Sequence, residues 1–168
     1  ALVTPFNTDG SVDYPALRDL VNWQIENGVT GLVPVGTTGE APTLDFAEHA
    51  QVIEAVAEAA AGKSVIIAGT GANSTAEAID LTRDVLNAGV DATLQVTPYY
   101  NKPNAEGLYR HFMSVAELGL PVVLYNVPGR TSKEIPLDVV VRLAAHPNIV
   151  AIKEAAGSVD RVSAIRNA

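Results

Sequence analysis

The segment ATLQVTP, residues 92–98, carries the clearest indication of the fold. In a β-strand, successive side chains point to opposite sides. Alternation therefore separates two aliphatic residues from three polar ones, namely Leu94 and Val96 from Thr93, Gln95 and Thr97. A parallel strand covered by helices on both faces is apolar on both sides, whereas the interior of a closed barrel tolerates polar side chains near its open end. The segment therefore favours a barrel over an open, doubly wound sheet.

Similar β-branched runs recur along the chain at nearly even intervals. Their starts are 33, 28, 29 and 27 residues apart, at Leu32, Val65, Thr93, Val122 and Ile149. This spacing fits one βα unit each, and helical patterns lie between the runs, one of them opened by a capping pair at Asp45 and Glu48. Strict alternation of strand and helix implies parallel strands with right-handed crossovers. We therefore predict an α/β protein with a (β/α)₈ barrel fold.

The length of 168 residues is too short for a complete barrel of this kind, which typically takes about 250 residues. The chain opens in an apolar run, ALVTPF, which we interpret as a first strand, and it ends in a helical pattern, SAIRNA. Counting that run, the sequence predicts six strands. We therefore expect an internal fragment, a partial barrel over residues 1–168 that lacks the last two βα units and any C-terminal helical region.

Composition and charge exclude several kinds of partner. Nineteen acidic residues outnumber eleven basic ones, and a formal net charge of −8 repels nucleic acid and anionic lipid. The chain has no cysteine, and its histidines show no metal-ligand spacing (His49, His111 and His146). No apolar run approaches the roughly 18 residues of a membrane helix. We expect a globular, cytoplasmic protein that binds no metal, nucleic acid or membrane.

One lysine stands where a barrel places its active-site groups, at the carboxyl end of a predicted strand. In NIVAIKE, residues 148–154, Val150 and Ile152 share one face and Lys153 lies on the other. If the aliphatic pair meets the helices, the amine points into the barrel, where desolvation favours its uncharged form. A free amine attacks carbonyl groups to form imines. The alternative for such a lysine is exposure to water or an ion pair with a carboxylate such as Glu154.

Further polar groups lie at the ends of other predicted strands. The turn GTTGE, residues 36–40, offers backbone N–H groups and the hydroxyls of Thr37 and Thr38 to one carboxylate. The phenol of Tyr125 could relay protons beside an imine, and Arg130 could hold a second carboxylate through two hydrogen bonds. Each also has an ordinary structural interpretation. GTTGE could be a simple βα turn, Tyr125 a core tyrosine and Arg130 a surface charge.

Five motifs, in order and at similar spacing, resemble those of the dihydrodipicolinate synthase family, within the pyruvate-dependent class I aldolases. They are VGTTGE (35–40), AGTGAN (68–73), TPYYNKP (97–103), YNVPGRT (125–131) and IKEA (152–155). The resemblance covers essentially the whole chain. It implies a lyase that condenses pyruvate with L-aspartate 4-semialdehyde to 4-hydroxy-tetrahydrodipicolinate, in lysine and diaminopimelate biosynthesis. It implies no metal and no dissociable cofactor.

The resemblance also implies roles for individual residues. Lys153 would form the Schiff base with pyruvate, Thr38 would hold the carboxylate of pyruvate, and Arg130 would bind the carboxylate of the aldehyde. Three hydroxyl groups would relay protons: those of Tyr125, Thr37 and Tyr100. Tyr100 would reach into the site of a neighbouring subunit, which implies a homo-oligomer, a dimer of dimers, for the full-length protein.

Two alternatives stay open beside the synthase. One is another aldolase of the superfamily, such as N-acetylneuraminate lyase or a 2-keto-3-deoxy sugar acid aldolase, and the other is an inactive barrel used for binding. The paired threonines and Arg130 favour the synthase, because an arginine suits a small acidic aldehyde better than a bulky sugar.

The resemblance extends to the regulatory site of the lysine-inhibited members. Four residues match positions of that site: His49, Asn73, Glu77 and Tyr99. Phe46 departs from the histidine that some lysine-sensitive members carry there. We therefore expect lysine to inhibit the protein weakly.

Overall fold

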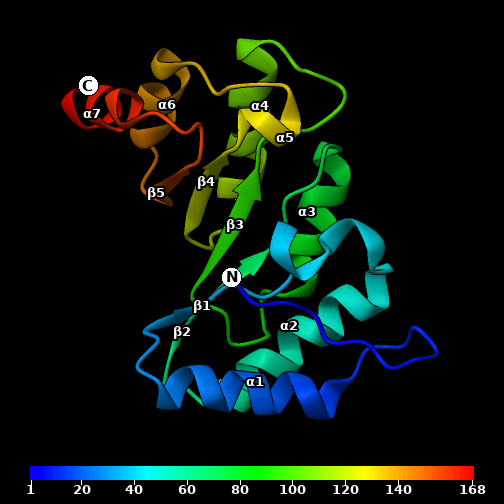
Figure 1. The fold of residues 1–168 in the computed structure, drawn as a ribbon. Coiled ribbons are helices and arrows are strands. Elements are labelled where there is room, and N and C mark those ends of the chain that lie inside the picture. Colours follow the sequence, from blue (N-terminus) through cyan, green and yellow to red (C-terminus); the bar gives the residue numbers. More distant parts are fainter. The chain divides into compact units, whose positions relative to one another are not determined.

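The computed structural model describes all 168 residues, and helices alternate with strands along the chain (Figure 1). The α-helices are α1 (Tyr14–Glu26), α2 (Phe46–Ala60), α3 (Thr75–Asp84), α4 (Ala105–Ala116), α5 (Pro128–Thr131), α6 (Leu137–Ala144) and α7 (Val159–Asn167). The strands are β1 (Gly31–Leu32), β2 (Val65–Gly69), β3 (Ala92–Val96), β4 (Val122–Asn126) and β5 (Ile149–Glu154), and two 3₁₀ helices follow β1, η1 (Thr37–Gly39) and η2 (Ala41–Thr43). The predicted alternation of strands and helices is confirmed.

The apolar run at the N-terminus does not form the strand that we predicted. The Leu2 N–H donates to the Val33 carbonyl at 3.0 Å, as a neighbouring strand would. Pro5, however, has no N–H to continue such a ladder, and Phe6 forms only an isolated antiparallel bridge with Val12. The structure therefore has five strands instead of six.

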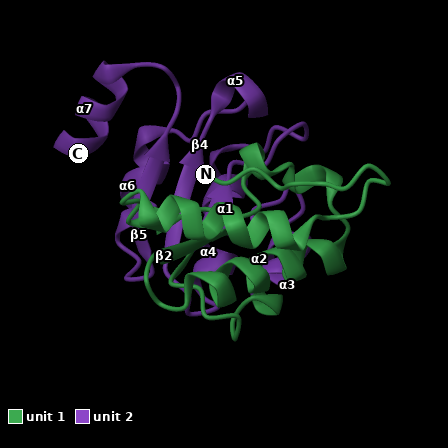
Figure 2. Ribbon diagram, turned by 60° about the horizontal axis from the view of Figure 1, so that its bottom comes forward, with its two compact units in different colours: residues 1–70, 83–92 green, residues 71–82, 93–168 purple.

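The chain divides into two compact units, which are described separately (Figure 2). Unit 1 comprises residues 1–70 and 83–92, and unit 2 comprises residues 71–82 and 93–168. The strands of unit 1, β1 and β2, are parallel, and so are β3, β4 and β5 of unit 2. No helix in the structure has both the length and the apolar character needed to cross a bilayer.

In unit 1, helices α1 and α2 lie side by side (Figure 1). Helix α1 begins after Asp13, whose carboxylate accepts a hydrogen bond from the Ala16 N–H. Helix α2 begins with the predicted capping box, in which Asp45 and Glu48 each accept a hydrogen bond from the other's N–H. The two helices bury an aliphatic set made of Leu17, Val21, Val52, Ile53 and Val56. Burial of such a face supplies most of a helix's stability in a folded protein.

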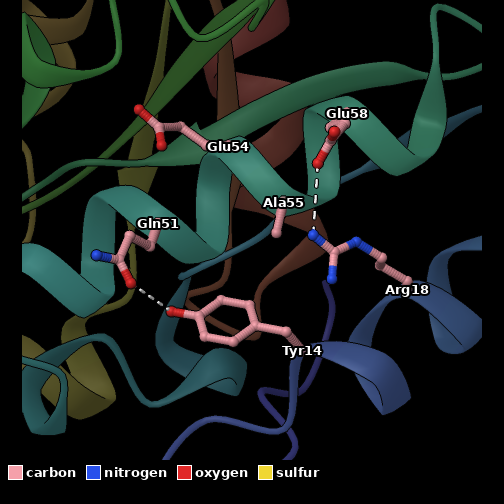
Figure 3. Close-up of a pocket in the computed structure, with 6 residues that line it drawn as sticks. All are labelled: Tyr14, Arg18, Gln51, Glu54, Ala55 and Glu58. Atoms are coloured by element: carbon pink, nitrogen blue, oxygen red, sulfur yellow. Dashed lines mark hydrogen bonds and ion pairs between the residues drawn. The ribbon is translucent and has the colours of Figure 1, made fainter.

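A shallow depression of about 330 Å³ lies between α1 and α2 (Figure 3). Across it, the Tyr14 hydroxyl donates to Gln51 at 3.0 Å, and Arg18 pairs with Glu58 at 3.4 Å. Both contacts are exposed, and a surface ion pair of this kind contributes at most about 1 kcal/mol. None of the predicted site residues lines the depression.

The core of unit 2 lies between its strands and helices α3, α4 and α6. Its fully buried side chains include Leu108 and Phe112 of α4, Leu124 of β4 and Leu143 of α6. Because Leu124 belongs to this core, its side of the sheet is the one that faces the helices. The neighbouring residues of β4, Val123 and Tyr125, therefore project to the opposite side.

The polar side of β3 faces the helices and not the barrel interior. Gln95 is paired in register with Leu124, and paired residues on neighbouring strands project to the same side of a sheet. Accordingly, the Gln95 amide donates to the Thr82 hydroxyl of α3 at 3.2 Å. Our prediction that these polar residues point into a barrel was wrong, because a helix side chain supplies the hydrogen-bond partner that a buried amide requires.

A bulge in β5 decides which of its side chains meet the helices. The register between β4 and β5 shifts after Val122, which leaves Val150 as an extra residue. Val150 is 57% exposed, whereas Ile149 and Ile152 pack against the core of unit 2. We predicted that Val150 and Ile152 pack against the helices. The prediction was wrong for Val150 and correct for Ile152. Lys153 nevertheless lies on the opposite side, as predicted.

The core of unit 2 also contains a histidine whose protonation costs stability. His111 of α4 is buried, with Nδ1 2.9 Å from the Thr75 hydroxyl and no hydrogen-bond partner at Nε2. Burial lowers the pKa of His111 from 6.5 to about 4. Between these two values the unfolded chain binds a proton that the folded chain does not bind. The contribution of neutral His111 to the free energy of unfolding is therefore fully present above pH 6.5. It is lost as the pH drops toward 4, by about 3 kcal/mol in total.

We expect a His111→Asn variant to lose this part of the pH dependence. Asparagine keeps a polar atom near Thr75 and cannot take up a proton in this range. Between pH 6.5 and 4, the thermal midpoint of the variant should therefore fall less steeply than that of the unaltered protein, as measured by calorimetry of the complete protein. Equal slopes would show that His111 is not the source.

Candidate functional site

Lys153 and Tyr125 stand next to each other at the carboxyl ends of β5 and β4. They are paired in register, and the Lys153 Nζ lies 4.3 Å from the centre of the Tyr125 ring. Both side chains are on the side of the sheet opposite the helix-packed Ile152. Lys153 forms no ion pair, and the neighbouring Glu154, on the other side of the strand, is paired with Arg161. The amine is therefore beside a phenol and open to a small carbonyl compound.

Lys153 is exposed in the structure of residues 1–168, whereas the predicted desolvation applied to the interior of a closed barrel. The reason is its position on β5, which is the edge strand of unit 2 and has β4 as its only neighbour there. The Tyr125 ring, which is buried, covers the ammonium on one side. Attraction between an ammonium and a ring face is worth about 0.5–1 kcal/mol at an exposed site. The pairing thus orients the lysine side chain along the strand ends.

The backbone of Tyr125 is held by Thr97, the residue that directly follows β3. Thr97 donates two hydrogen bonds to the Tyr125 carbonyl, one from its N–H at 2.9 Å and one from its hydroxyl at 3.0 Å. Thr97 is fully buried. Its hydroxyl is thus a structural group that anchors the tyrosine.

A polar cluster that we did not predict lies on the opposite side of the same strand ends. The Asn126 amide donates to both carboxylate oxygens of Glu154 at 2.9 Å. The same carboxylate accepts from the Ala156 N–H at 2.8 Å and from the Arg161 Nε at 3.3 Å. The sequence did contain an indication of this cluster. Asn126 and Glu154 each directly follow a predicted site residue, so their side chains project to the other side of the sheet.

Tyr100 projects away from its own chain. It is 89% exposed, and its φ of +73° is seldom adopted by residues other than glycine. Lys102, two residues later, also has a positive φ. Unusual backbone conformations of this kind often occur at functional sites. The conformation leaves the phenol of Tyr100 free to contact another molecule.

Arg130 lies in the short helix α5, which follows β4. Its N–H donates to the Val127 carbonyl at 2.9 Å, while its guanidinium is exposed and forms no ion pair. The fork of a free guanidinium binds carboxylates through two parallel hydrogen bonds. The guanidinium of Arg130 is therefore accessible, and its binding of a carboxylate stays a prediction.

Three of the four predicted regulatory residues gather in unit 2. The Asn73 amide donates to the Tyr99 carbonyl at 3.2 Å. The pKa of Tyr99 is raised by burial first and by the nearby charge of Glu77 second. These contacts bring Asn73, Glu77 and Tyr99 together.

His49 lies in α2 of unit 1, where it is buried. Burial lowers the pKa of His49, and its Nδ1 has no hydrogen-bond partner. No group of three or more histidine, aspartate or glutamate residues lies close enough together to hold a metal ion. We therefore assign no metal ligand among these side chains.

Thr37 and Thr38 lie in η1 of unit 1, and both are exposed. The first N–H groups of a helical turn have no acceptor within the helix. The preceding backbone is unusual, because Val35 has a φ of +51°, an outlier for a β-branched residue. It is also tightly packed, since a Cβ added to Gly69 would lie 2.1 Å from the Val35 carbonyl oxygen. The turn thus presents N–H groups and hydroxyls on a rigid support, which suits a carboxylate.

Parallel βα units with polar side chains at the carboxyl ends of their strands place the chain among the α/β proteins, a class that includes the (β/α)₈ barrels. Within this class, the chain belongs to the dihydrodipicolinate synthetase family, whose model matches residues 1–168. The predicted barrel fold and the predicted family are both confirmed by this match and by solved structures of the family.

Two solved structures and one curated relative illustrate the similarity. A 4-hydroxy-tetrahydrodipicolinate synthase of Neisseria meningitidis serogroup C is 56% identical over 160 residues, which are 95% of this chain and 55% of that protein. The chloride-inhibited dihydrodipicolinate synthase of Acinetobacter baumannii complexed with pyruvate is 54% identical, with a TM-score of 0.97 over 99% of this chain and 58% of that one. The dihydrodipicolinate synthase of Cyanidioschyzon merolae with lysine bound is 44% identical, with a TM-score of 0.97 over 100% of this chain and 58% of that one. The chain spans about half the length of the curated relatives it matches.

Proposed function

We propose that the complete protein carrying these residues condenses pyruvate with L-aspartate 4-semialdehyde through a Schiff base on Lys153. The product is 4-hydroxy-tetrahydrodipicolinate, a precursor of diaminopimelate and lysine. The observation that carries the proposal is the Lys153 amine, 4.3 Å from the Tyr125 ring centre at the strand ends and without an ion pair. The names of the relatives support it, as does the Acinetobacter baumannii structure, which is described as a pyruvate complex.

The reaction follows from the chemistry of an amine and a keto acid. The Lys153 amine adds to the carbonyl carbon of pyruvate, and the carbonyl oxygen leaves as water, which gives an imine. Loss of a methyl proton converts the imine into an enamine, whose methylene carbon attacks the aldehyde carbon of the second substrate. The amine of that substrate then adds to the imine carbon and displaces Lys153, which closes the ring. We expect no metal or dissociable cofactor, because the covalent imine supplies the electron sink.

The remaining predicted residues supply binding and proton transfer in this proposal. Thr38 holds the carboxylate of pyruvate, and Arg130 holds the carboxylate of the aldehyde through its free guanidinium. Proton transfer falls to three hydroxyl groups, those of Tyr125, Thr37 and Tyr100.

Tyr100 acts in this proposal across a subunit boundary. Its 89% exposure and positive φ support a contact with a second copy of the chain. We therefore expect a homo-oligomer, a dimer of dimers, in the cytoplasm, with residues 1–168 as the partial barrel predicted from the sequence.

Borohydride trapping tests the proposal most directly. Reduction in the presence of pyruvate should attach one reduced pyruvate to the peptide that contains Lys153, as seen by mass spectrometry. Consumption of aspartate semialdehyde should then accompany consumption of pyruvate. Trapping without use of this aldehyde would instead indicate another aldolase of the superfamily. Absence of any adduct would leave a barrel that binds without catalysis and would refute the proposal.

Regulation by lysine is a further part of the proposal. The gathering of Asn73, Glu77 and Tyr99 supports it, as does the lysine-bound relative from Cyanidioschyzon merolae. Phe46 is 59% exposed and offers no hydrogen bond from its side chain. We therefore expect inhibition that needs more lysine than in members with histidine at this position. Turnover of the complete protein, measured against lysine concentration up to the millimolar range, checks this, and no response would remove the regulatory role.

A further inference from the structure

Arg161, in the first turn of α7, connects three segments of unit 2. Its Nη1 lies 2.8 Å from a carboxylate oxygen of Glu134, its Nε lies 3.3 Å from Glu154, and its Nη2 donates to the carbonyl of Ile135. The Arg161 side chain is only 15% exposed and that of Glu154 only 7%. The planar fork of an arginine can serve several acceptors in fixed directions, which a lysine cannot do. Arg161 therefore joins the end of β5 to the segment between α5 and α6.

The cluster also reaches the end of β4. Asn126 donates to Glu154 from its amide nitrogen and accepts from the Ile135 N–H at 3.0 Å through its amide oxygen. Its backbone carbonyl accepts from the Ala155 N–H at 2.8 Å. Asn126, Glu154 and Arg161 each form at least one side-chain hydrogen bond to another segment, so none can move without breaking a hydrogen bond that is at least partly buried.

The polar cluster lies on one side of the ends of β4 and β5, and the reactive pair of Lys153 and Tyr125 lies on the other side. Glu154 directly follows Lys153, and Asn126 directly follows Tyr125. The bonds of Glu154 and Asn126 therefore determine the backbone positions from which the amine and the phenol project. The segment held at Glu134 and Ile135 lies a few residues after Arg130, on the same connection.

We infer that Arg161 is a positioning residue for the reaction: through Glu154 and Asn126 it holds the ends of β5 and β4 so that the Lys153 amine stays beside Tyr125. The inference rests on the proposed function, to which it adds a residue that touches neither substrate. A small displacement of a reacting group can cost about 10²-fold in rate. Binding of pyruvate should be less affected, because its carboxylate is held by other residues.

The test is an Arg161→Met variant of the complete protein, in which the length of the side chain is kept and its donors are lost. We expect kcat and the rate of pyruvate trapping by borohydride to fall about 10- to 100-fold, with little change in the KM for pyruvate. Arg166→Met is the matched control, because Arg166 lies on the same helix, is exposed and forms no ion pair. This control should keep the activity of the unaltered protein. A folded Arg161→Met variant with unchanged rates would overturn the inference.

A second variant separates positioning from simple charge compensation. Arg161→Met leaves the buried Glu154 carboxylate without its cation, which by itself lowers stability. The double variant Glu154→Gln, Arg161→Met removes both charges and keeps an oxygen acceptor for Asn126. It should recover most of the lost thermal stability while its kcat stays low, because the link to Glu134 and Ile135 is still missing. Recovery of kcat together with stability would show that Arg161 only neutralises a charge.

Trapping in the unaltered protein distinguishes this inference from the function on which it rests. If the unaltered protein traps no pyruvate, the proposed function fails and the inference fails with it. If the unaltered protein traps pyruvate on Lys153 and the Arg161→Met variant traps it equally fast, the inference alone fails.

Discussion

Replacement of Lys153 by alanine should lower kcat of the complete protein by at least about 10⁴-fold, because the nucleophile that forms the imine is removed. The structure offers no substitute, since the only basic group placed over the Tyr125 ring is the Lys153 amine. Steady-state turnover with pyruvate and aspartate semialdehyde measures the loss. Mass spectrometry after borohydride treatment should show no pyruvate adduct on the variant.

Arginine at the same position is the matched control for this experiment. Lys153→Arg keeps a cation that can stack on the Tyr125 ring, but a guanidinium does not form the imine. We expect the same loss of activity in both variants, with a thermal midpoint in the arginine variant close to that of the unaltered protein. Turnover by either variant at more than a tenth of the original rate would place the Schiff base on another residue.

Replacement of Gly69 by alanine should cause the largest loss of stability among the changes considered. A Cβ at Gly69 would lie 2.1 Å from the carbonyl oxygen of Val35 and 2.9 Å from the N of Gly36. Both are backbone atoms, so the clash cannot be relieved by rotating a side chain, and Val35 already has a positive φ. Overpacking costs about 1–3 kcal/mol, and we expect a value at or above the upper end. Urea unfolding of the complete protein measures it.

Gly129→Ala is the control for the Gly69 experiment. A Cβ at Gly129 meets no atom within 4 Å, and this glycine does not have a positive φ. Its free energy of unfolding should change by no more than about 1 kcal/mol. The folded fraction of Gly69→Ala should also bind pyruvate less tightly, because Thr37 and Thr38 follow directly after the displaced turn. Equal stability of the two variants would mean that the turn can yield without cost.

The regular features of the fold follow from patterns within single segments. The spacing of β-branched runs predicted all five strands that the structure contains, and the pair Asp45 and Glu48 predicted the start of α2. Lys153 was also assigned to the correct side of its strand. Alternation and capping act over a few neighbouring residues, and the spacing of the runs is a pattern along the chain, so none of these predictions needed a contact between distant segments.

The errors concern contacts between segments. The N-terminal run was expected to be a strand, but Pro5 interrupts its pairing with the Val33 region. Gln95 was assigned to the barrel interior, and it instead donates to Thr82 of α3. Val150 was assigned to the helix side, and the bulge in β5 exposes it. Such positions depend on strand register, on bulges and on the side chains of neighbouring helices. None of these can be predicted from the pattern of a single segment.

The sequence by itself determined the order of the five strands and the helices between them, the family through its five motifs, and the strand end at which the lysine stands. Only the tertiary structure decided that the amine lies beside the Tyr125 ring and that Arg161 holds the buried Glu154 behind it. The physical reason is the distance along the chain over which each effect acts. Alternation and capping act between residues a few positions apart, whereas a buried charge needs partners that other segments bring to it through folding.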